Sequence, residues 1–227
     1  GAAIAQCFAE AGAKIAIADL DGEGARKMAA SLATPSIGLS ADASDGNAMR
    51  SAADQIVAEL GSLDILINNA GIGGPDTNAT KASLEVPFTE LSDEAWDTHL
   101  RINLRTTFAS TKAAIPHLSR GSCIINIASI WGREHGGNIA YMSAKAALIG
   151  ATKHAGVTLA GDGILVNSIA PGSISHAGGS WERFQSENPP EVVSEFIEHN
   201  LPMGRFGWPE PVGDLVAFLA SERASLI

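Results

Sequence analysis

The fold is decided by residues 123–145, which read CIINIASIWGREHGGNIAYMSAK. The run Cys123–Ile127 is apolar apart from one asparagine, and such a run predicts a buried strand. The residues from Ala140 to Ala160 then favour a helix. A buried strand followed by a helix is typical of a parallel sheet, because parallel neighbours must be joined by a crossover connection.

The same alternation of helix and strand runs along the rest of the chain. Further apolar runs predict strands at Lys14–Ala18, Ile37–Leu39, Asp64–Asn68 and Leu165–Ile169. Helical spacing of apolar residues predicts helices before Gly12, over 25–32 and 49–60, from Ser92 to Ile115, and over Glu191–His199 and Val212–Ala220. We therefore expect one domain, residues 1–227, with a doubly wound (Rossmann-type) α/β fold: a mostly parallel sheet with helices on both faces.

Composition and charge exclude several classes of protein. The formal net charge is -10, and the 15 lysines and arginines are scattered, so nucleic acids and acidic membranes are poor partners. No apolar run is long enough to cross a bilayer, and no secretion signal opens the chain. Neither the two cysteines nor the six histidines have metal-ligand spacing. We expect reduced thiols, no metal and a cytoplasmic protein.

Short or polar residues follow the predicted strands. They are Asp19, Asp42, Asn69-Ala70-Gly71, Ser129 and Pro171-Gly172. In open α/β sheets, ligands bind outside the carboxyl ends of the strands. The sequence therefore predicts that these residues surround one ligand site.

One tyrosine and one lysine are spaced for acid/base chemistry. Tyr141 and Lys145 are four residues apart on a predicted helix, so their side chains share a face, and Ser129 ends the preceding strand. A phenol has a pKa of about 10, and a nearby ammonium would lower it. The same spacing also occurs where a tyrosine packs and a lysine is solvated, so the pair alone leaves both interpretations open.

A longer series of motifs includes this pair. Its members are Asn69-Ala70-Gly71, Asn103, Ser129, Tyr141-Met142-Ser143-Ala144-Lys145 and the residues from Asn167 to Gly172. With this series the sequence resembles the short-chain dehydrogenase/reductase family over nearly its whole length. The resemblance implies that Tyr141 is the acid/base and that Ser129 holds the substrate oxygen. It also implies that Lys145 lowers the pKa of Tyr141 and binds the nicotinamide ribose, while Asn103 helps to place a water that links Lys145 to solvent.

These implied roles agree with the chemistry of hydride transfer, which creates or removes charge on one oxygen. A pair of donors at that oxygen stabilises the transition state selectively. For Ser129 the alternative is a strand-end hydroxyl that satisfies backbone groups. For Asn103 it is a polar residue that packs inside a helix.

The resemblance also implies a dinucleotide site, and Asp19 favours NAD over NADP. A carboxylate at the end of this strand can accept hydrogen bonds from the adenosine ribose and repel a 2′-phosphate. Two like charges ~4 Å apart cost on the order of 4 kcal/mol at an effective dielectric constant of 20, and the next residue, Leu20, is not an arginine. The alternative is that Asp19 is a turn residue before Asp21.

Further cofactor contacts are expected by resemblance. Besides Asp19 and Leu20, they are Gly1, Asp42, Ala43, Asn69, Ala70, Gly71, Ile127, Tyr141, Lys145, Pro171, Gly172, Ile174 and Ser175. Ser175 stands where the family more often has threonine. The family carries a strand and a glycine-rich turn before the first helix, and only Gly1 of this segment is present. Relatives also continue through one more strand after Ile227, so we expect the sequence to be trimmed at both ends. The effect of the missing glycine-rich segment on cofactor choice is left open.

Residues 173–207 form the one irregular region and are expected to be a substrate-loop insertion, the alternative being a solvated excursion. The side chains expected to line a substrate cleft are Trp131, His135, Trp181 and Phe184. His176 either touches substrate or is an exposed loop residue.

The leading hypothesis is a dehydrogenase/reductase that acts on a secondary alcohol or ketone. One alternative is a 3-oxoacyl thioester (acyl-carrier-protein) reductase that uses NADPH. Its acidic carrier would need a basic patch, for which the sequence offers only Arg101, Arg105, Lys112 and Arg133. Another alternative is a catalytically silent nucleotide-binding regulator.

Family resemblance implies a homo-oligomer, either a tetramer or a dimer. The substrate, its stereochemistry, the reaction direction and the oligomeric state are left open.

Overall fold

Two parallel sheets form the centre of the structure, a computed structural model that describes residues 1–72, 87–136 and 138–227. In the smaller sheet, β1 (Ile15–Asp19) pairs with β2 (Ser36–Ser40). In the larger sheet, β4 (Cys123–Ile127) lies between β3 (Ile65–Asn68) and β5 (Leu165–Ile169). All of these pairings are parallel, as the sequence predicts.

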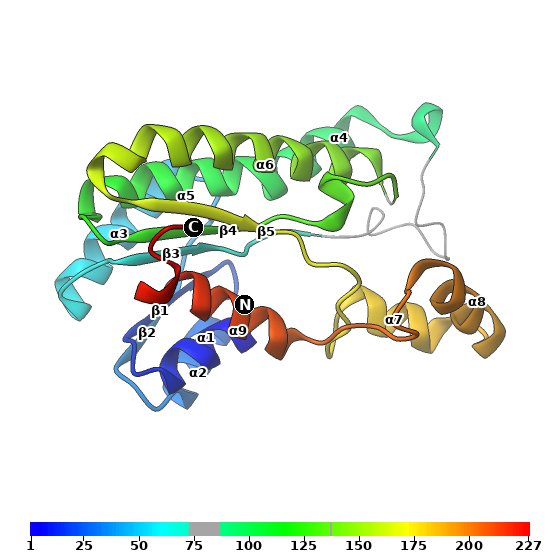
Figure 1. Cartoon of the computed structure of the whole chain (residues 1–227), viewed down its shortest axis with the longest axis horizontal. Coiled ribbons are helices and arrows are strands. Elements are labelled where there is room, and N and C mark those ends of the chain that lie inside the picture. The colour runs from blue at the N-terminus through cyan, green and yellow to red at the C-terminus, as the bar shows by residue number, and fades with distance from the viewer. Residues whose placement is uncertain (73–86, 137) are drawn as a thin grey trace.

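Helices cover both faces of the larger sheet (Figure 1). On one side lie α4 (Asp93–Leu100), α5 (Thr106–Ala114) and α6 (Ile139–Leu159). On the other side lie α1 (Ala2–Glu10) and α9 (Pro209–Leu219). The smaller sheet is covered by α2 (Gly22–Ser31), while α3 (Gly46–Leu60) packs against α5. The predicted doubly wound α/β class is confirmed.

The main core lies between β4, α1 and α9. Ile125 of β4 is fully buried, and it belongs to one apolar cluster with Phe8 of α1 and Val216 of α9. The amphipathic helix at the start of the chain thus packs against a helix near its end. This packing fixes the sheet edge at which the predicted ligand residues gather.

The predicted single sheet is divided in two. Among the described residues no strand lies between β1 and β3, so these strands do not pair with each other. A cavity of about 820 Å³ separates them, lined by residues that include Ile15 and Ile17 of β1 and Ile65 and Ile67 of β3. Each of the two strands therefore has one edge without a strand partner in this part of the chain.

The long helix predicted from Ser92 to Ile115 is present but interrupted. Ser92 caps α4 by accepting a hydrogen bond from the Ala95 amide at 3.1 Å. A single π turn, Arg101–Arg105, then separates α4 from α5. Such turns occur frequently at functional sites, and this one contains Asn103.

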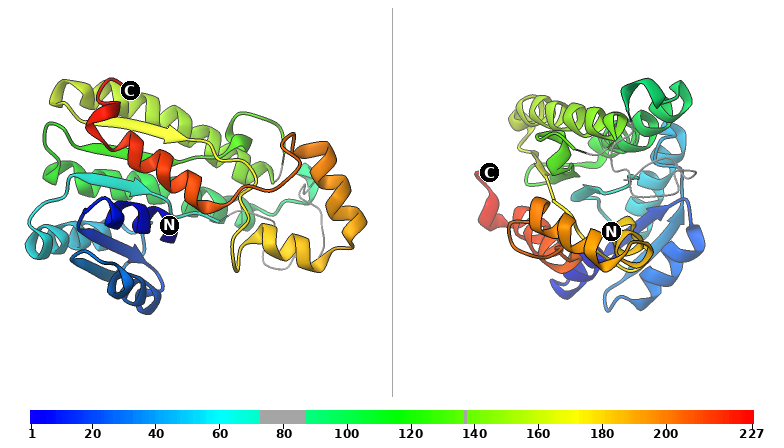
Figure 2. Two further views of the ribbon diagram at one scale, coloured as in Figure 1. Left: turned by 60° about the horizontal axis from the view of Figure 1, so that its bottom comes forward. Right: turned by 90° about the vertical axis from the view of Figure 1, so that its right-hand side faces the viewer.

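The irregular region contains two helices that extend beyond the carboxyl ends of β3, β4 and β5 (Figures 1 and 2). The predicted helix over Glu191–His199 is confirmed as α8 (Pro190–Asn200), whereas α7 (Ser180–Glu187) was not predicted. The two ends of the region are joined, because Ile174 and Gly207 form a parallel bridge. Within the described residues, no helix has the length and apolar character needed to span a membrane.

Candidate active site

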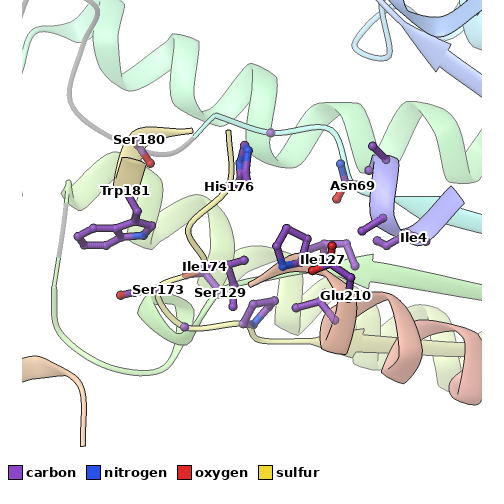
Figure 3. A pocket seen from close by; sticks show the side chains of 18 of the residues that line it. Ile4, Asn69, Ile127, Ser129, Ser173, Ile174, His176, Ser180, Trp181 and Glu210 are labelled. Carbon is purple, nitrogen blue, oxygen red and sulfur yellow. The ribbon is translucent and has the colours of Figure 1, made fainter. Parts of the chain in front are cut away.

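A cavity of about 1060 Å³ lies at the carboxyl ends of the larger sheet (Figure 3). It brings together these predicted site residues: Gly1, Asn69, Gly71, Ile127, Ser129, Tyr141, Pro171, Gly172 and Ile174. Gly1 precedes α1, Tyr141 lies in the first turn of α6, and the others lie at or after the ends of β3, β4 and β5. Of the residues predicted to follow the strands, Asn69, Gly71, Ser129, Pro171 and Gly172 line this cavity, whereas Asp19, Asp42 and Ala70 do not.

Tyr141 is held beside Ser129 by the start of α6. The Asn138 side chain caps this helix by accepting hydrogen bonds from the amides of Ala140 at 2.8 Å and Tyr141 at 3.4 Å. Ser129 follows β4, and its hydroxyl accepts from the Trp131 amide at 3.2 Å. The same hydroxyl is near enough to the Tyr141 phenol to lower the pKa of the phenol. A phenol and a hydroxyl thus converge inside the cavity.

Lys145 lies against the ring of Tyr141. Its Nζ is 5.6 Å from the ring centroid and donates a hydrogen bond to the Ile127 carbonyl oxygen at 2.8 Å. Only 4% of Lys145 is exposed, and this burial lowers the pKa of its ammonium to about 8. The predicted group of phenol, ammonium and hydroxyl is therefore present around Tyr141.

The pKa of Tyr141 shifts in the direction opposite to the one that the sequence predicts. Burial raises the pKa of the phenol above its usual value, and the nearby Ser129 hydroxyl opposes this only in part. Lys145 lies over the ring face and is bonded to a carbonyl, and burial disfavours its own charged form. The expected lowering by the ammonium is thus wrong, because desolvation dominates here.

Asn103 is fully buried in the π turn, where it holds the strand-end loop after β3. Its Oδ1 accepts a hydrogen bond from the Ile72 amide at 3.1 Å. Gly71 makes this approach possible, since a Cβ there would lie 2.8 Å from Asn103 Oδ1 and 3.4 Å from Lys145 Nζ. Asn103 is therefore buried and hydrogen-bonded, as expected of a polar residue that packs inside a helix. It also lies near Lys145, the predicted catalytic lysine.

His99 is a site residue that the sequence analysis missed. It is only 3% exposed, and its Nδ1 lies 3.4 Å from Asn103 Nδ2. Its ring meets that of Tyr141 edge to face, with centroids 6.4 Å apart. Its position four residues before Asn103 was the available signal, because such residues share a helix face.

The predicted adenosine-side residues lie around the second cavity. Asp19, Ala43 and Ala70 line it, and Gly1 and Asn69 line both cavities. Asp19 also stabilises the turn that follows β1, which was the alternative role considered for it. Its Oδ1 accepts a hydrogen bond from the Asp21 amide at 2.9 Å.

Four predicted cofactor residues, Leu20, Asp42, Lys145 and Ser175, line neither of these cavities as far as the structure describes the chain. Leu20 is 73% exposed. Asp42 accepts hydrogen bonds from the hydroxyl and amide of Ser44 at 2.7 and 2.8 Å, and these bonds lower its pKa. The Ser175 hydroxyl accepts from Gln185 Nε2 at 2.9 Å. These side chains are engaged in local hydrogen bonds or point to solvent.

The start of α1 offers backbone donors that fit the pyrophosphate of a dinucleotide. Gly1 caps α1 without a side chain, so no side chain occupies the first-turn amides of this helix. Such amides are suited to an anion such as a pyrophosphate. A Cβ at Gly1 would lie 3.2 Å from Asn69 Nδ2, so a larger residue would crowd the junction of the two cavities.

The expected substrate-side residues divide into two groups. Trp131, Trp181, Phe184 and His176 line the cavity, whereas His135 is not among the described lining residues.

Among residues whose placement is described, no group of three or more His, Cys, Asp or Glu side chains could hold a metal ion. Both cysteines are free thiols.

The chain is similar to known oxidoreductases along its length. Residues 1–227 match a family described as "Enoyl-(Acyl carrier protein) reductase". The chain is 33% identical over 238 residues to D-threitol dehydrogenase of Mycolicibacterium smegmatis, covering 100% of this chain and 84% of the relative. It is 33% identical over 186 residues to 3-oxoacyl-[acyl-carrier-protein] reductase FabG of Thermotoga maritima, covering 81% and 69%. A short-chain dehydrogenase from Burkholderia cenocepacia J2315 in complex with NADP superposes with a TM-score of 0.83 and 29% identity, covering 100% and 88%.

Proposed function

Because the chain belongs to the short-chain dehydrogenase/reductase family of oxidoreductases, we propose that it transfers a hydride between NAD(H) and a secondary alcohol or ketone, with Tyr141 as acid/base. One observation carries this proposal. The Ser129 hydroxyl and the Tyr141 phenol line the same cavity and interact there, and the Lys145 ammonium lies 5.6 Å from the centroid of the tyrosine ring. Two donors meeting at one point are what a reacting carbonyl oxygen requires.

The residues of this chain act on the substrate oxygen. Ser129 donates a hydrogen bond to it, and Tyr141 gives it the phenolic proton during reduction or removes the alcohol proton during oxidation. The dinucleotide, when bound, supplies or accepts the hydride. A raised pKa keeps Tyr141 protonated near neutral pH, which suits a proton donor.

Lys145 lies over the ring of Tyr141, where its ammonium can bind the cofactor. One of its three N–H donors is used by the Ile127 carbonyl, so others can hold ribose hydroxyls. Asn103 orders the loop at Gly71 next to this ammonium, and it thereby positions the lysine.

The test is a nicotinamide-absorbance assay with a panel of ketones and secondary alcohols, using both dinucleotides. Replacing Tyr141 by phenylalanine removes the proton donor, and turnover should fall by at least ~100-fold. Binding of NADH, followed by its fluorescence, should be nearly unchanged. A variant that keeps a tenth of wild-type turnover would refute the role of Tyr141.

NAD is the proposed cofactor because of Asp19. This carboxylate lines the second cavity at the end of β1, and the neighbouring Leu20 brings no positive charge. Asp19→Ala should narrow the preference for NAD over NADP, measured as the ratio of the two kcat/KM values. An unchanged ratio would mean that Asp19 acts only in the turn with Asp21.

A second candidate is reduction of a 3-oxoacyl thioester with NADPH, which is favoured by the similarity to the reductase of Thermotoga maritima. Two of the basic residues considered for a carrier-binding patch are already engaged, since Arg101 and Arg105 bond to Ser44. A 3-oxoacyl thioester therefore belongs in the substrate panel. If it alone is reduced, and with NADPH, this second candidate replaces the first.

We also propose that the protein is cytoplasmic and forms a homo-oligomer. Exposed apolar side chains on the long helices support the assembly, since Phe108 of α5 is 64% exposed and Val157 of α6 is 80% exposed. Light scattering of the purified protein would give the number of subunits.

A further inference from the structure

A continuous series of aromatic rings leads from the catalytic tyrosine to the irregular region. The Trp131 ring meets Tyr141 edge to face at a centroid distance of 6.2 Å, and it lies 6.1 Å from the Trp181 ring. Trp181 then contacts Phe184 at 5.7 Å and Phe196 at 5.0 Å. Trp181 thus joins the reacting end of the cavity to α7 and α8.

Only part of this series faces the cavity. Trp131, Trp181 and Phe184 line it, and Figure 3 shows Trp181 among the lining side chains with Ser129. Phe196 and Phe206 pack against Trp181 but do not line this cavity, and their rings stack at 5.9 Å with an interplanar angle of 8°. The cavity therefore has an aromatic wall, which we define as Trp131, Trp181 and Phe184, with further rings behind it.

The backbone holds both halves of this wall in place. At Gly132 a Cβ would lie 2.9 Å from the Lys145 backbone, so the turn that carries Trp131 packs directly on α6. On the other half, the Glu182 carboxylate accepts from the Gly178 amide at 2.6 Å, and Arg183 donates to the Gly178 carbonyl at 2.8 Å. These contacts order the start of α7 and the side chain of Trp181.

The charged side chains of the cavity are separate from the wall. Glu10 of α1 and Glu210 and Asp214 of α9 lie on other elements, while Arg183 and Glu187 share α7 with the wall but stand at exposed positions, as does His176. The wall next to Tyr141 offers ring faces and edges. Such surfaces favour flat apolar rings, which stack or pack edge to face at these distances.

On the basis of the proposed function, we propose that the substrate carries an aromatic ring on the reacting carbon, as in an aryl ketone or its alcohol, and that Trp181 determines this specificity. With the oxygen held by Tyr141 and Ser129, the substituent of the carbonyl carbon lies along the aromatic wall. An alkyl chain would gain apolar contact with Trp131 and Trp181, but it would lack the stacking and edge-to-face interactions that a ring adds.

Three ketones with the same number of carbon atoms test the inference: acetophenone, cyclohexyl methyl ketone and 2-octanone. Wild type should prefer acetophenone, measured by kcat/KM. Trp181→Leu should lower kcat/KM for acetophenone by about tenfold or more and leave that for 2-octanone nearly unchanged. Phe206→Leu is the matched control, because Phe206 packs on Trp181 outside the cavity.

Trp181 also packs in the irregular region, so Trp181→Phe provides a variant that retains a ring. It should keep most of the preference for acetophenone, and thermal unfolding should show that each variant is folded. Equal losses for all three ketones in Trp181→Leu, or a wild type that prefers 2-octanone, would overturn the inference while leaving the proposed function intact. If none of the three ketones is reduced while another member of the substrate panel is turned over, the inference fails and the proposed function stands. If no member of the panel is turned over with either dinucleotide, both fail.

Discussion

The pKa of Tyr141 is determined mainly by the burial of its side chain. It is the single tyrosine of the chain, half-buried between the rings of His99 and Trp131. The ammonium beneath its ring is itself so buried that its pKa lies at about 8. Burial raises the pKa of Tyr141 more than the Ser129 hydroxyl lowers it, so the phenol remains protonated near neutral pH.

The pKa of Tyr141 can be measured directly, because the chain has a single tyrosine. Because burial raises the pKa of Tyr141, phenolate absorbance in the native protein should appear with a midpoint above the usual 10.0. In urea, where the ring is solvated, the midpoint should return to about 10. The native state then holds its proton longer than the unfolded state, so stability should fall as the pH rises above about 10. A native midpoint at or below the unfolded one would contradict the account.

Residue positions were more predictable than residue environments. Spacing placed Tyr141 and Lys145 on one helix face, and the strand-end rule placed Ser129 beside them. Sequence spacing says nothing about desolvation, so the direction of the Tyr141 pKa shift was predicted wrongly. His99 was missed because a histidine within a helix pattern gives no sign of being buried.

The π turn between α4 and α5 is the element that shapes the lysine's surroundings. It brings Asn103 against the loop after β3, where Gly71 leaves room for the amide oxygen. The same loop position lies near Lys145. Loop, turn and helix therefore meet at a point where one added methyl group would force a displacement.

Gly71→Ala tests this close contact. The new Cβ would lie 2.8 Å from Asn103 Oδ1, which is too short, so Asn103 or the loop must move. We expect kcat/KM to fall by about ten- to hundredfold, because small misplacements of catalytic groups are costly. Gly150→Ala on α6 is the control, since a Cβ there meets nothing within 4 Å. Wild-type kcat/KM in Gly71→Ala would show that the contact is irrelevant.

Elements with clear periodicity were predictable and others were not. The strands β4 and β5 have the predicted bounds, and α6 differs from its predicted bounds by one residue at each end. The π turn was missed because its apolar residues continue the pattern of the long helix. Helix α7 was missed because its SWERFQSE sequence has too few apolar residues to show a period, although Trp181 and Phe184 lie one turn apart.

At the scale of the whole molecule, the sheets and helices converge on one end. The strands β3, β4 and β5 point their carboxyl ends at the cavity, while α7 and α8 extend past it (Figures 1 and 2). The doubly wound class followed from apolar strands alternating with helices. The separation of β1 from β3 did not, because alternation gives the order of elements and not the pairing of distant edges.

The central claim is that this cavity performs hydride transfer with Tyr141 supplying the proton. Its most direct test uses NADH that carries deuterium at the transferable position of the nicotinamide ring, with a ketone that the protein reduces. Mass spectrometry should find the deuterium on the carbinol carbon of the product with wild type, and essentially none over the same period with Tyr141→Phe. Absence of deuterium in the wild-type product, or equal incorporation by the two proteins, would contradict the claim.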